Sequence, residues 1–76
     1  DGTIGAMPNV VVLRKRGPRA DEILDAFEER TRLAARDGDE ARIFTLAGAG
    51  HDIDVEGELD AVDPQWAEHV ELVTEL

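Results

Sequence analysis

The chain has 76 residues and contains no cysteine, no serine and no tyrosine, and its only aromatic side chains are Phe27, Phe44 and Trp66. Without cysteine, neither a disulfide framework nor a thiolate metal site can reinforce the fold. The hydrophobic fraction of 42% includes ten alanines, so the side chains available for a core are small as well as few. Small domains with thin cores are often reinforced by a partner subunit. We therefore expect a homodimer.

Long apolar runs are also missing, and none approaches the roughly 20 residues that are needed to span a bilayer. The first residues show no charged-then-apolar secretion pattern. We therefore expect a cytoplasmic protein without a membrane partner. Residues 1–6 precede Met7 and the first strand-like residues, and we expect them to be a cloning remnant. Residues 7–76 are expected to form a single α+β domain.

Positive charge is scarce: eight basic residues, of which only Lys15 is a lysine, stand against 18 acidic ones, and the net charge is −10. Such a chain repels nucleic acid at long range, so we do not expect a nucleic-acid partner. Many carboxylates and little lysine suit a high-salt cytoplasm, where a Debye length of about 3 Å at 1 M salt screens self-repulsion. A high-GC bacterial source, which also favours arginine and alanine, is the alternative.

The first half of the chain predicts a strand followed by a helix. Val10 to Leu13 are four consecutive aliphatic residues within 9–15, typical of a strand that is buried on both faces and lies centrally in its sheet. A helix is expected over 18–37, starting at Gly17-Pro18 and ending at Gly38. Its apolar residues recur at steps of three and four and predict one buried stripe: Ala20, Ile23, Leu24, Phe27, Thr31 and Ala34.

The second half predicts a hairpin and an ambiguous final segment. Alternating residues predict strands over 41–47 and 51–59, joined by a glycine-containing turn at 48–50, with a bulge at Gly57. Asp63-Pro64 resembles a helix start, and Trp66, Val70 and Val73 form a helical stripe. Residues 70–76 also alternate as a strand would. We favour a helix over 64–76 and keep a fourth strand as the alternative.

Together these elements predict an α+β fold, a small two-layer sandwich of order β-α-β-β followed by a C-terminal helix or fourth strand. One helix would pack on a sheet of three or four strands. A right-handed crossover would make the first two strands parallel if they are neighbours in the sheet.

One candidate binding site is a basic cluster made of Arg14, Lys15, Arg16 and Arg19, where the first strand ends and the helix begins. These side chains and the helix N-terminal amides could contact a phosphate or a nucleic acid. The alternative is a charged strand end that discourages edge pairing. The opposing net charge of the chain favours this second interpretation.

A second candidate is a series of carboxylates: Asp52, Asp54, Glu56, Glu58 and Asp60. On a strand, side chains two residues apart diverge along a line, so at most two neighbours could share a divalent cation. The solvated face of a strand is therefore the favoured interpretation. Zinc would need both His51 and His69 with two carboxylates, and their spacing gives no sign of convergence, so we expect no metal and no cofactor.

Catalysis by a nucleophile has little support, because Thr31 is expected in mid-helix and Thr45 in mid-strand, away from any exposed turn. We expect no enzyme but a small acidic interaction or regulatory module that acts through self-association and a protein partner. Trp66 is the candidate interface anchor, although packing in the core is the favoured role. The alternative functions are phosphate or nucleic-acid binding at the basic cluster and weak divalent-cation binding by the acidic series.

Overall fold

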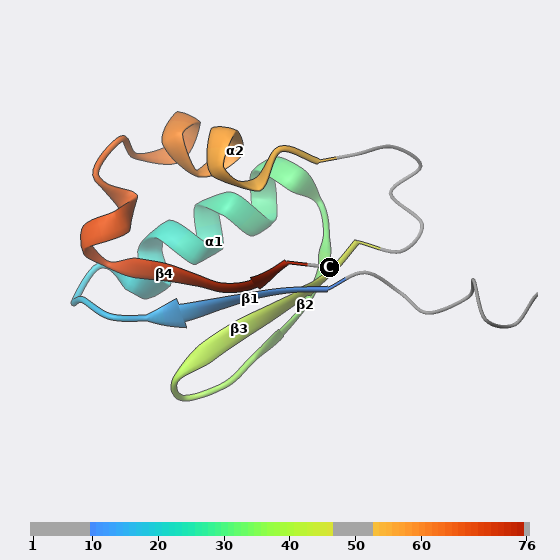
Figure 1. Ribbon diagram of the computed structural model, residues 1–76, viewed down its shortest axis with the longest axis horizontal. Helices are drawn as coiled ribbons and strands as arrows, with labels where there is room; N and C mark the ends of the chain where they lie inside the picture. Colours follow the sequence, from blue (N-terminus) through green and yellow to red (C-terminus); the bar gives the residue numbers. More distant parts are fainter. Residues whose placement is uncertain (1–9, 47–52, 76) are drawn as a thin grey trace, which may run out of the picture.

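The computed structural model describes residues 10–46 and 53–75 and, over these ranges, consists of two α-helices packed on one face of a four-stranded antiparallel sheet (Figure 1). Its elements are β1 (Val10–Lys15), α1 (Ala20–Thr31), β2 (Ala34–Asp37), β3 (Ala41–Thr45), α2 (Val55–Val62), the 3-10 helix η2 (Trp66–Glu68) and β4 (Val70–Glu75). The α+β class predicted from the sequence is confirmed. Within the described ranges, no helix is long and apolar enough to cross a membrane.

The strand order in the sheet is β2-β3-β1-β4, so β1 is central, as its aliphatic run predicts. It pairs antiparallel with β3 on one side and with β4 on the other, where a bulge falls between Val12 and Leu13. The expectation of parallel pairing was wrong. After α1 the chain runs in the same direction as β1 when it forms β2. However, β3 lies between β1 and β2 in the sheet and is antiparallel to both.

The core lies between the sheet and the two helices. Val11 and Leu13 of β1 are fully buried against α1, whose predicted apolar stripe is confirmed at Ala20, Ile23, Leu24 and Phe27. The rings of Phe27 and Phe44 meet edge to face, with centroids 4.9 Å apart. Each such side chain stabilises the fold by about 1.5–3 kcal/mol when it leaves water. Most of the hydrophobic stabilisation therefore comes from this one layer.

The helix predicted over 18–37 is shorter than expected. It ends at Thr31, because Arg32 adopts a left-handed conformation (φ 61°) and its N–H bonds to the Glu28 carbonyl. The residues that follow form the edge strand β2 instead. Gly38, predicted as the helix stop, lies in the β2–β3 turn and donates its N–H to the Ala41 carbonyl. As a strand, residues 34–37 pair with β3, and this pairing satisfies their backbone N–H and C=O groups.

The strand predicted over 51–59 was wrong, since residues 55–62 form α2. Asp54 caps this helix by accepting the N–H of Gly57, and a side chain at position 57 would overlap the Asp54 carboxylate. Gly57 therefore makes room for the Asp54 cap of α2, and the bulge predicted at this position does not exist. Val55 and Leu59, four residues apart, are buried against the rest of the core. Their spacing fits one helix face as well as one strand face, which explains the error.

The helix favoured over 64–76 was also wrong, and the alternative of a fourth strand is the one observed. Asp63 does not start a long helix: its carboxylate accepts the N–H of Gln65, and only the short η2 follows. The chain then pairs with the remaining edge of β1 as β4, which buries Val70 and packs Leu72 against the core. The predicted turn at 48–50 lies outside the described residues, as do His51 and Asp52.

Candidate interaction surface

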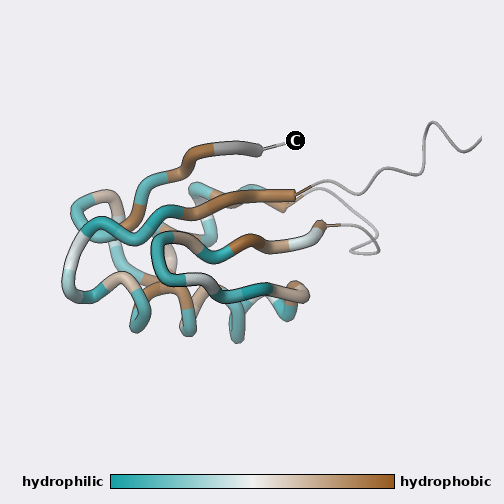
Figure 2. Tube along the Cα trace, turned by 90° about the horizontal axis from the view of Figure 1, so that it is seen from below, coloured by the Kyte–Doolittle hydropathy of each residue, from teal (hydrophilic) through white to brown (hydrophobic). Residues whose placement is uncertain are grey.

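The two faces of the sheet differ in what covers them. Both α-helices lie on one side, and Figure 2 views the sheet from the other, where no element of the described ranges lies over the strands. We call this second side the open face. Strand alternation and register place these residues on it: Val10, Val12 and Arg14 of β1; Ala41, Ile43 and Thr45 of β3; Ala34 and Arg36 of β2; Glu71 and Val73 of β4.

An apolar strip crosses the middle of the open face. Val12 is directly opposite Ile43 in the β1–β3 register, and both keep contact with water. Ile43 is 38% exposed and Val73 is 46% exposed, and these are the large exposed hydrophobic residues of the part of the chain described. Apolar residues that are contiguous across strands and left in water mark surfaces that other proteins cover.

The open face is hollowed at one edge. Small side chains on β2 leave a shallow depression of about 380 Å³, lined by Ala34, Ala35, Arg36, Ile43 and Thr45. On this face Ala34 extends little beyond the backbone, and the longer side chains of Arg36 and Ile43, which are opposite each other in the register, lie next to it. At the opposite edge of the sheet, Val73 of β4 protrudes. The face therefore has a depression at one edge and an apolar protrusion at the other.

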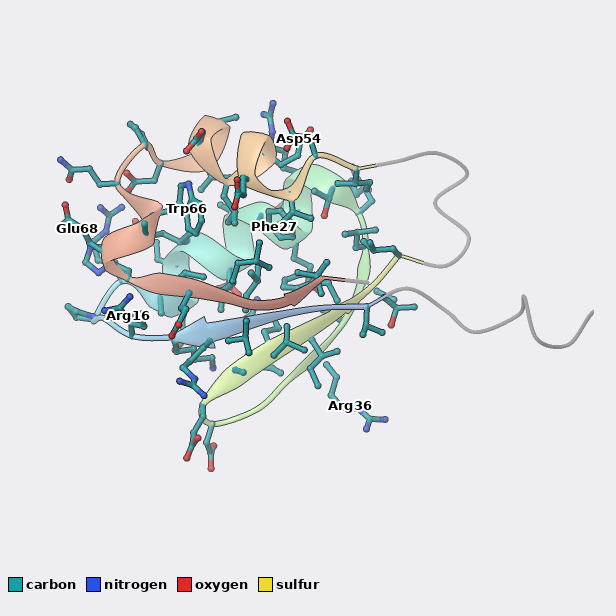
Figure 3. The ribbon with its side chains drawn as sticks, in the orientation of Figure 1. Arg16, Phe27, Arg36, Asp54, Trp66 and Glu68 are labelled. Carbon is teal, nitrogen blue, oxygen red and sulfur yellow. The ribbon has the colours of Figure 1, made fainter. Side chains whose placement is uncertain are left out.

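The charge on this face differs from that of the whole chain. Arg14 pairs with Glu71, with 3.7 Å between Nη1 and Oε1, and both side chains are about half exposed. Arg36 points away from the helix layer in Figure 3 and has no carboxylate within 4.0 Å among residues 10–46 and 53–75. The described side chains of the open face thus carry two positive charges and one negative, in a chain whose net charge is −10.

On the covered side, the edge of the sheet is held by ion pairs around Arg42. Its guanidinium is nearly buried and bonds to Asp37 and Asp25 at 2.8 Å each and to Glu28 at 3.1 Å. Lys15 bridges Asp21 and Asp37 at 2.8 and 3.0 Å. These contacts tie α1 to β1, β2 and β3. Both cations are thus engaged by acids of the same molecule, and the cluster stabilises the fold.

The pKa values in this cluster follow from the same contacts. Hydrogen bonds from Lys15 and then Arg42 lower the pKa of Asp37. The bonds to Asp21 and Asp37 raise the pKa of Lys15. Burial alone would lower the pKa of Arg42, but its bonds to Asp37 and Asp25 outweigh burial and raise it. All three groups are therefore charged over the whole neutral range.

The predicted basic cluster does not converge on one point. Lys15 contacts acids of α1 and β2, and Arg14 pairs across the sheet with Glu71. Arg19 contacts Glu22 at 3.1 Å and Asp63 at 2.9 Å, and its hydrogen bond to Glu22 lowers the pKa of Glu22. Arg16 alone of the four has no carboxylate within 4.0 Å in the described part of the chain. Three of the four charges are thus already balanced by acids of the same molecule.

The described members of the acidic series, Asp54, Glu56, Glu58 and Asp60, lie at the start of α2 and along it, and they do not follow a strand face. Asp54 caps the helix, Glu58 bonds to Arg30 of α1, and Asp60 accepts the indole N–H of Trp66 at 2.7 Å. Over residues 10–46 and 53–75, no three His, Asp or Glu side chains are grouped so that they could hold a metal ion. The carboxylates that were candidate cation ligands therefore act mainly as caps and contacts between helices.

The remaining candidates, His69 and Trp66, lie near η2. The carbonyl of His69 accepts N–H bonds from Arg16 and Gly17, and its Nδ1 is buried without a hydrogen-bond partner. Gly17 allows this close approach, because a Cβ there would be 2.5 Å from that nitrogen. Trp66 is half-buried and packs against the core (Figure 3), as the favoured interpretation of the sequence had it.

No known protein family, curated protein or solved structure matches this chain. The candidate surface therefore rests on the molecule's own geometry. Sequence reasoning placed Val73 in a helical stripe and assigned none of Arg36, Ile43 and Val73 to an interaction surface. The alternation of residues 41–45 signals that Ile43 and Phe44 point to opposite faces, but which face is covered depends on where the helices pack.

Proposed function

We propose that this protein is a non-catalytic interaction module, cytoplasmic and adapted to high salt, that acts by docking its open face on another protein surface. The observation that carries the proposal is the set of apolar side chains that the described elements leave uncovered: the cross-strand pair of Val12 and Ile43, and Val73 at the bulge of β4. The open face carries few charged side chains, whereas the helix layer on the other side of the sheet is strongly acidic. Interface centres are likewise poor in charge and rich in apolar contact.

The hydroxyl groups support a non-catalytic role. The chain has no serine, cysteine or tyrosine. The hydroxyl of Thr31 donates to the Phe27 carbonyl at 2.9 Å and accepts from the N–H of Leu33, so it is engaged in the end of α1. Thr45 is the last residue of β3, opposite Val10, and lines the shallow depression. In the described part of the chain, neither of these two hydroxyls is hydrogen-bonded to a side chain that could act as the general base of a nucleophile.

The acidic helix layer supports the high-salt part of the proposal. Glu22, Asp25 and Glu29 are exposed on α1, and Glu56 and Asp60 are exposed on α2. This concentration of negative charge repels itself at low ionic strength and is screened at high salt. We expect the melting temperature to rise between about 0.1 and 3 M KCl, a range over which screening becomes nearly complete. A flat or falling melting temperature would contradict the adaptation without affecting the docking surface.

Site-specific photo-cross-linking in the cells of origin tests the docking surface. A benzophenone amino acid is placed at Ile43, in the middle of the open face, and in a matched variant at Glu29, exposed on α1. We expect a discrete cross-linked species from position 43 and none from position 29. A chain that cross-links equally from both positions, or from neither, would refute the open face as the working surface.

A second variant separates loss of binding from loss of folding. Val12→Asp, combined with the cross-linker at Ile43, places a charge in the centre of the strip, where a partner would have to desolvate it. We expect the cross-linked species to disappear, while the circular dichroism spectrum stays that of the parent. Because Val12 lies on the uncovered side, its replacement leaves the core intact.

A further inference from the structure

We propose that the partner of this protein binds as an extended strand along the outer edge of β2 and antiparallel to it, with an acidic residue opposite Arg36 and basic residues on the helix side. This inference rests on the proposed function and names the chemistry of the partner. Three observations carry it: the outward backbone groups of β2, the depressions on both sides of this edge, and the charge on each side.

The backbone of β2 has unpaired groups on its outer side, because β2 is the last strand in the order β2-β3-β1-β4. In an antiparallel pair, successive residues bond alternately to the partner strand and away from it. Gly38 donates its N–H to the Ala41 carbonyl, so residues 34, 36 and 38 bond to β3, and Ala35 and Asp37 direct their N–H and C=O groups outward. Within residues 10–46 and 53–75, no backbone group bonds to these outward groups. They are available to a further strand.

Nothing in β2 itself obstructs such a strand. All four of its residues are exposed, and it contains no proline and no bulge, two features by which other proteins keep edge strands from pairing. Ala34 and Ala35 end at Cβ and leave the backbone beside them accessible. An extended segment can therefore approach to hydrogen-bonding distance.

Depressions lie on both sides of this edge. The one on the open face, of about 380 Å³, includes Ala34 and Thr45. A second, of about 420 Å³, lies on the helix side where α1 leads into β2, and it is lined by Asp25, Glu28, Glu29, Arg32 and Leu33. Successive side chains of a strand point to opposite faces, so an added strand directs them alternately toward the two depressions. Strand addition takes affinity from main-chain bonds and specificity from pockets for alternate side chains.

The two sides of the edge differ in charge. On the open face, Arg36 has no carboxylate within 4.0 Å in the described ranges. On the helix side, Asp25 and Glu28 of α1 reach toward β2, since both accept bonds from Arg42, which also bonds to Asp37. The depression on that side is lined by three acids and one arginine. A complementary strand has an acidic residue opposite Arg36 and basic residues before and after it.

The register argues against a second copy of β2 as this strand. Two β2 strands that pair antiparallel through their outward residues place Ala34, Arg36 or Gly38 of one copy opposite Arg36 of the other. None of these has a carboxylate, and Asp37 points to the helix side, where it bonds to Arg42. Arg36 would face an alanine, a glycine or a like charge, which is unfavourable directly across strands. We therefore assign the edge to a segment of a different protein.

The register also defines the sequence of that segment. In an antiparallel strand, the residue opposite Ala34 comes two positions after the residue opposite Arg36, and the depression there suits a β-branched aliphatic side chain. The residues opposite Asp37 and Ala35 project to the helix side and are basic. From N to C, the segment opposite residues 37 to 34 therefore reads Lys-Glu-Lys-Val.

The test is an NMR titration of the full ¹⁵N-labelled chain with the capped peptide Thr-Lys-Glu-Lys-Val-Thr, at about 0.15 M KCl, where the Debye length is about 8 Å. We expect a dissociation constant on the order of 0.1–1 mM, because a short strand buries little area. The amide signals of Ala35 and Asp37 should move most, and those of β4 at the opposite edge should stay in place. If the signals of Ala35 and Asp37 do not move at about 5 mM peptide, well above the expected constant, the proposal is overturned.

Two N-methylated peptides separate strand addition from other modes of binding. Methylation at the second lysine, opposite Ala35, removes an N–H that donates to β2 and should weaken binding at least tenfold. The matched peptide is methylated at its glutamate, whose N–H points away from β2, and should bind within about threefold of the parent. Equal affinities of the two methylated peptides would show that the peptide does not pair with β2.

A charge exchange tests the residue opposite Arg36. Arg36→Glu should weaken binding of the parent peptide about fivefold, and a peptide with lysine in place of its glutamate should bind this variant within about threefold of the parent pair. The control Arg16→Glu makes the same charge change at an exposed residue outside β2 and should leave the parent peptide's affinity unchanged. Circular dichroism identifies a variant that fails to fold, and Arg36→Gln then replaces Arg36→Glu. Equal weakening by both variants would refute the pairing with Arg36.

The two proposals fail differently. If the peptide does not bind along β2 but position 43 cross-links to a protein in cells, strand addition is refuted and the docking surface stands. If position 43 does not cross-link at all, the docking surface itself is refuted.

Discussion

The two faces of the sheet carry similar aliphatic side chains with opposite consequences. On β1, Val11 and Leu13 are completely buried beneath the helices, whereas Val10 and Val12, of the same chemical kind, keep contact with water. Figure 3 shows the same contrast between Phe27, enclosed between helix and sheet, and Arg36, directed away from both. The covered face holds the molecule together, and the open face remains free for contact with another surface.

The largest effect expected from this comparison is the loss of a core ring. Phe27→Ala should lower the free energy of unfolding by about 3–5 kcal/mol, because it leaves a cavity against Phe44. That is a large part of the stability of so small a domain. Ile43→Ala on the open face should change it by no more than about 1 kcal/mol. Urea denaturation followed by Trp66 fluorescence measures both, and equal losses would mean that the two faces do not differ.

The next effect concerns the ion pairs that hold the covered side. Arg42→Met should cost about 1.5–3 kcal/mol, since it removes hydrogen bonds to charged groups and leaves Asp25, Glu28 and Asp37 to repel one another. Arg16→Met removes the same charge from a residue that has no such contacts in the described part of the chain, and it should cost less than about 0.5 kcal/mol. The same denaturation experiment compares them, and similar losses would show that net charge matters more than the contacts.

The pH dependence of the cluster sharpens the comparison further. The pKa of Asp37 is lowered in the folded chain by Lys15 and Arg42, so this carboxylate stabilises the fold above its unfolded pKa of about 3.9. That contribution is lost as the pH falls through the lower, folded value. Asp37→Asn should therefore melt below the parent at pH 7, and the gap should narrow as the pH falls below the unfolded pKa of about 3.9. A gap independent of pH would refute the role of its charge.

The smallest effect is a gain in stability where the chain leaves the helix layer for the sheet. Arg32 is the non-glycine residue with positive φ in the described part of the chain, and it connects α1 to β2 by way of Leu33. Glycine adopts this conformation without steric cost, so Arg32→Gly should raise stability by about 0.5–1 kcal/mol. A differential melt of the two proteins measures it, and a lower melting temperature would contradict this reading of the turn.

The parts of the fold that could be predicted were those in which the apolar residues fit either a strand or a helix but not both. The run Val10 to Leu13 predicted a central strand, and the stripe from Ala20 to Phe27 predicted the buried face of α1. Residues 55–59 were misassigned because Val55 and Leu59, four apart, suit a strand and a helix equally. The cap formed by Asp54 and Gly57, which decides between them, is a local signal that the alternating pattern obscured.

The candidate surface could be predicted only in part. Alternation in residues 41–45 separates Ile43 from Phe44, but both are apolar, and nothing in the alternation says which side the helices occupy. Arg36 fell within the helix predicted over 18–37, so its position on the edge strand β2 was not predicted. The pairing of Arg42 with acids from α1 and β2 likewise depends on residues that are distant in sequence.

The sequence by itself determined the composition of this protein: its acidity, the absence of thiol and serine chemistry, the central strand and the amphipathic first helix. The tertiary structure alone decided the rest. Residues 70–75 form a fourth strand because they pair with the edge of β1 that β3 does not occupy. This pairing satisfies the backbone N–H and C=O groups of both strands. Both helices pack on one side of the sheet, and the other side is left uncovered by residues 10–46 and 53–75, a choice that local periodicity cannot encode.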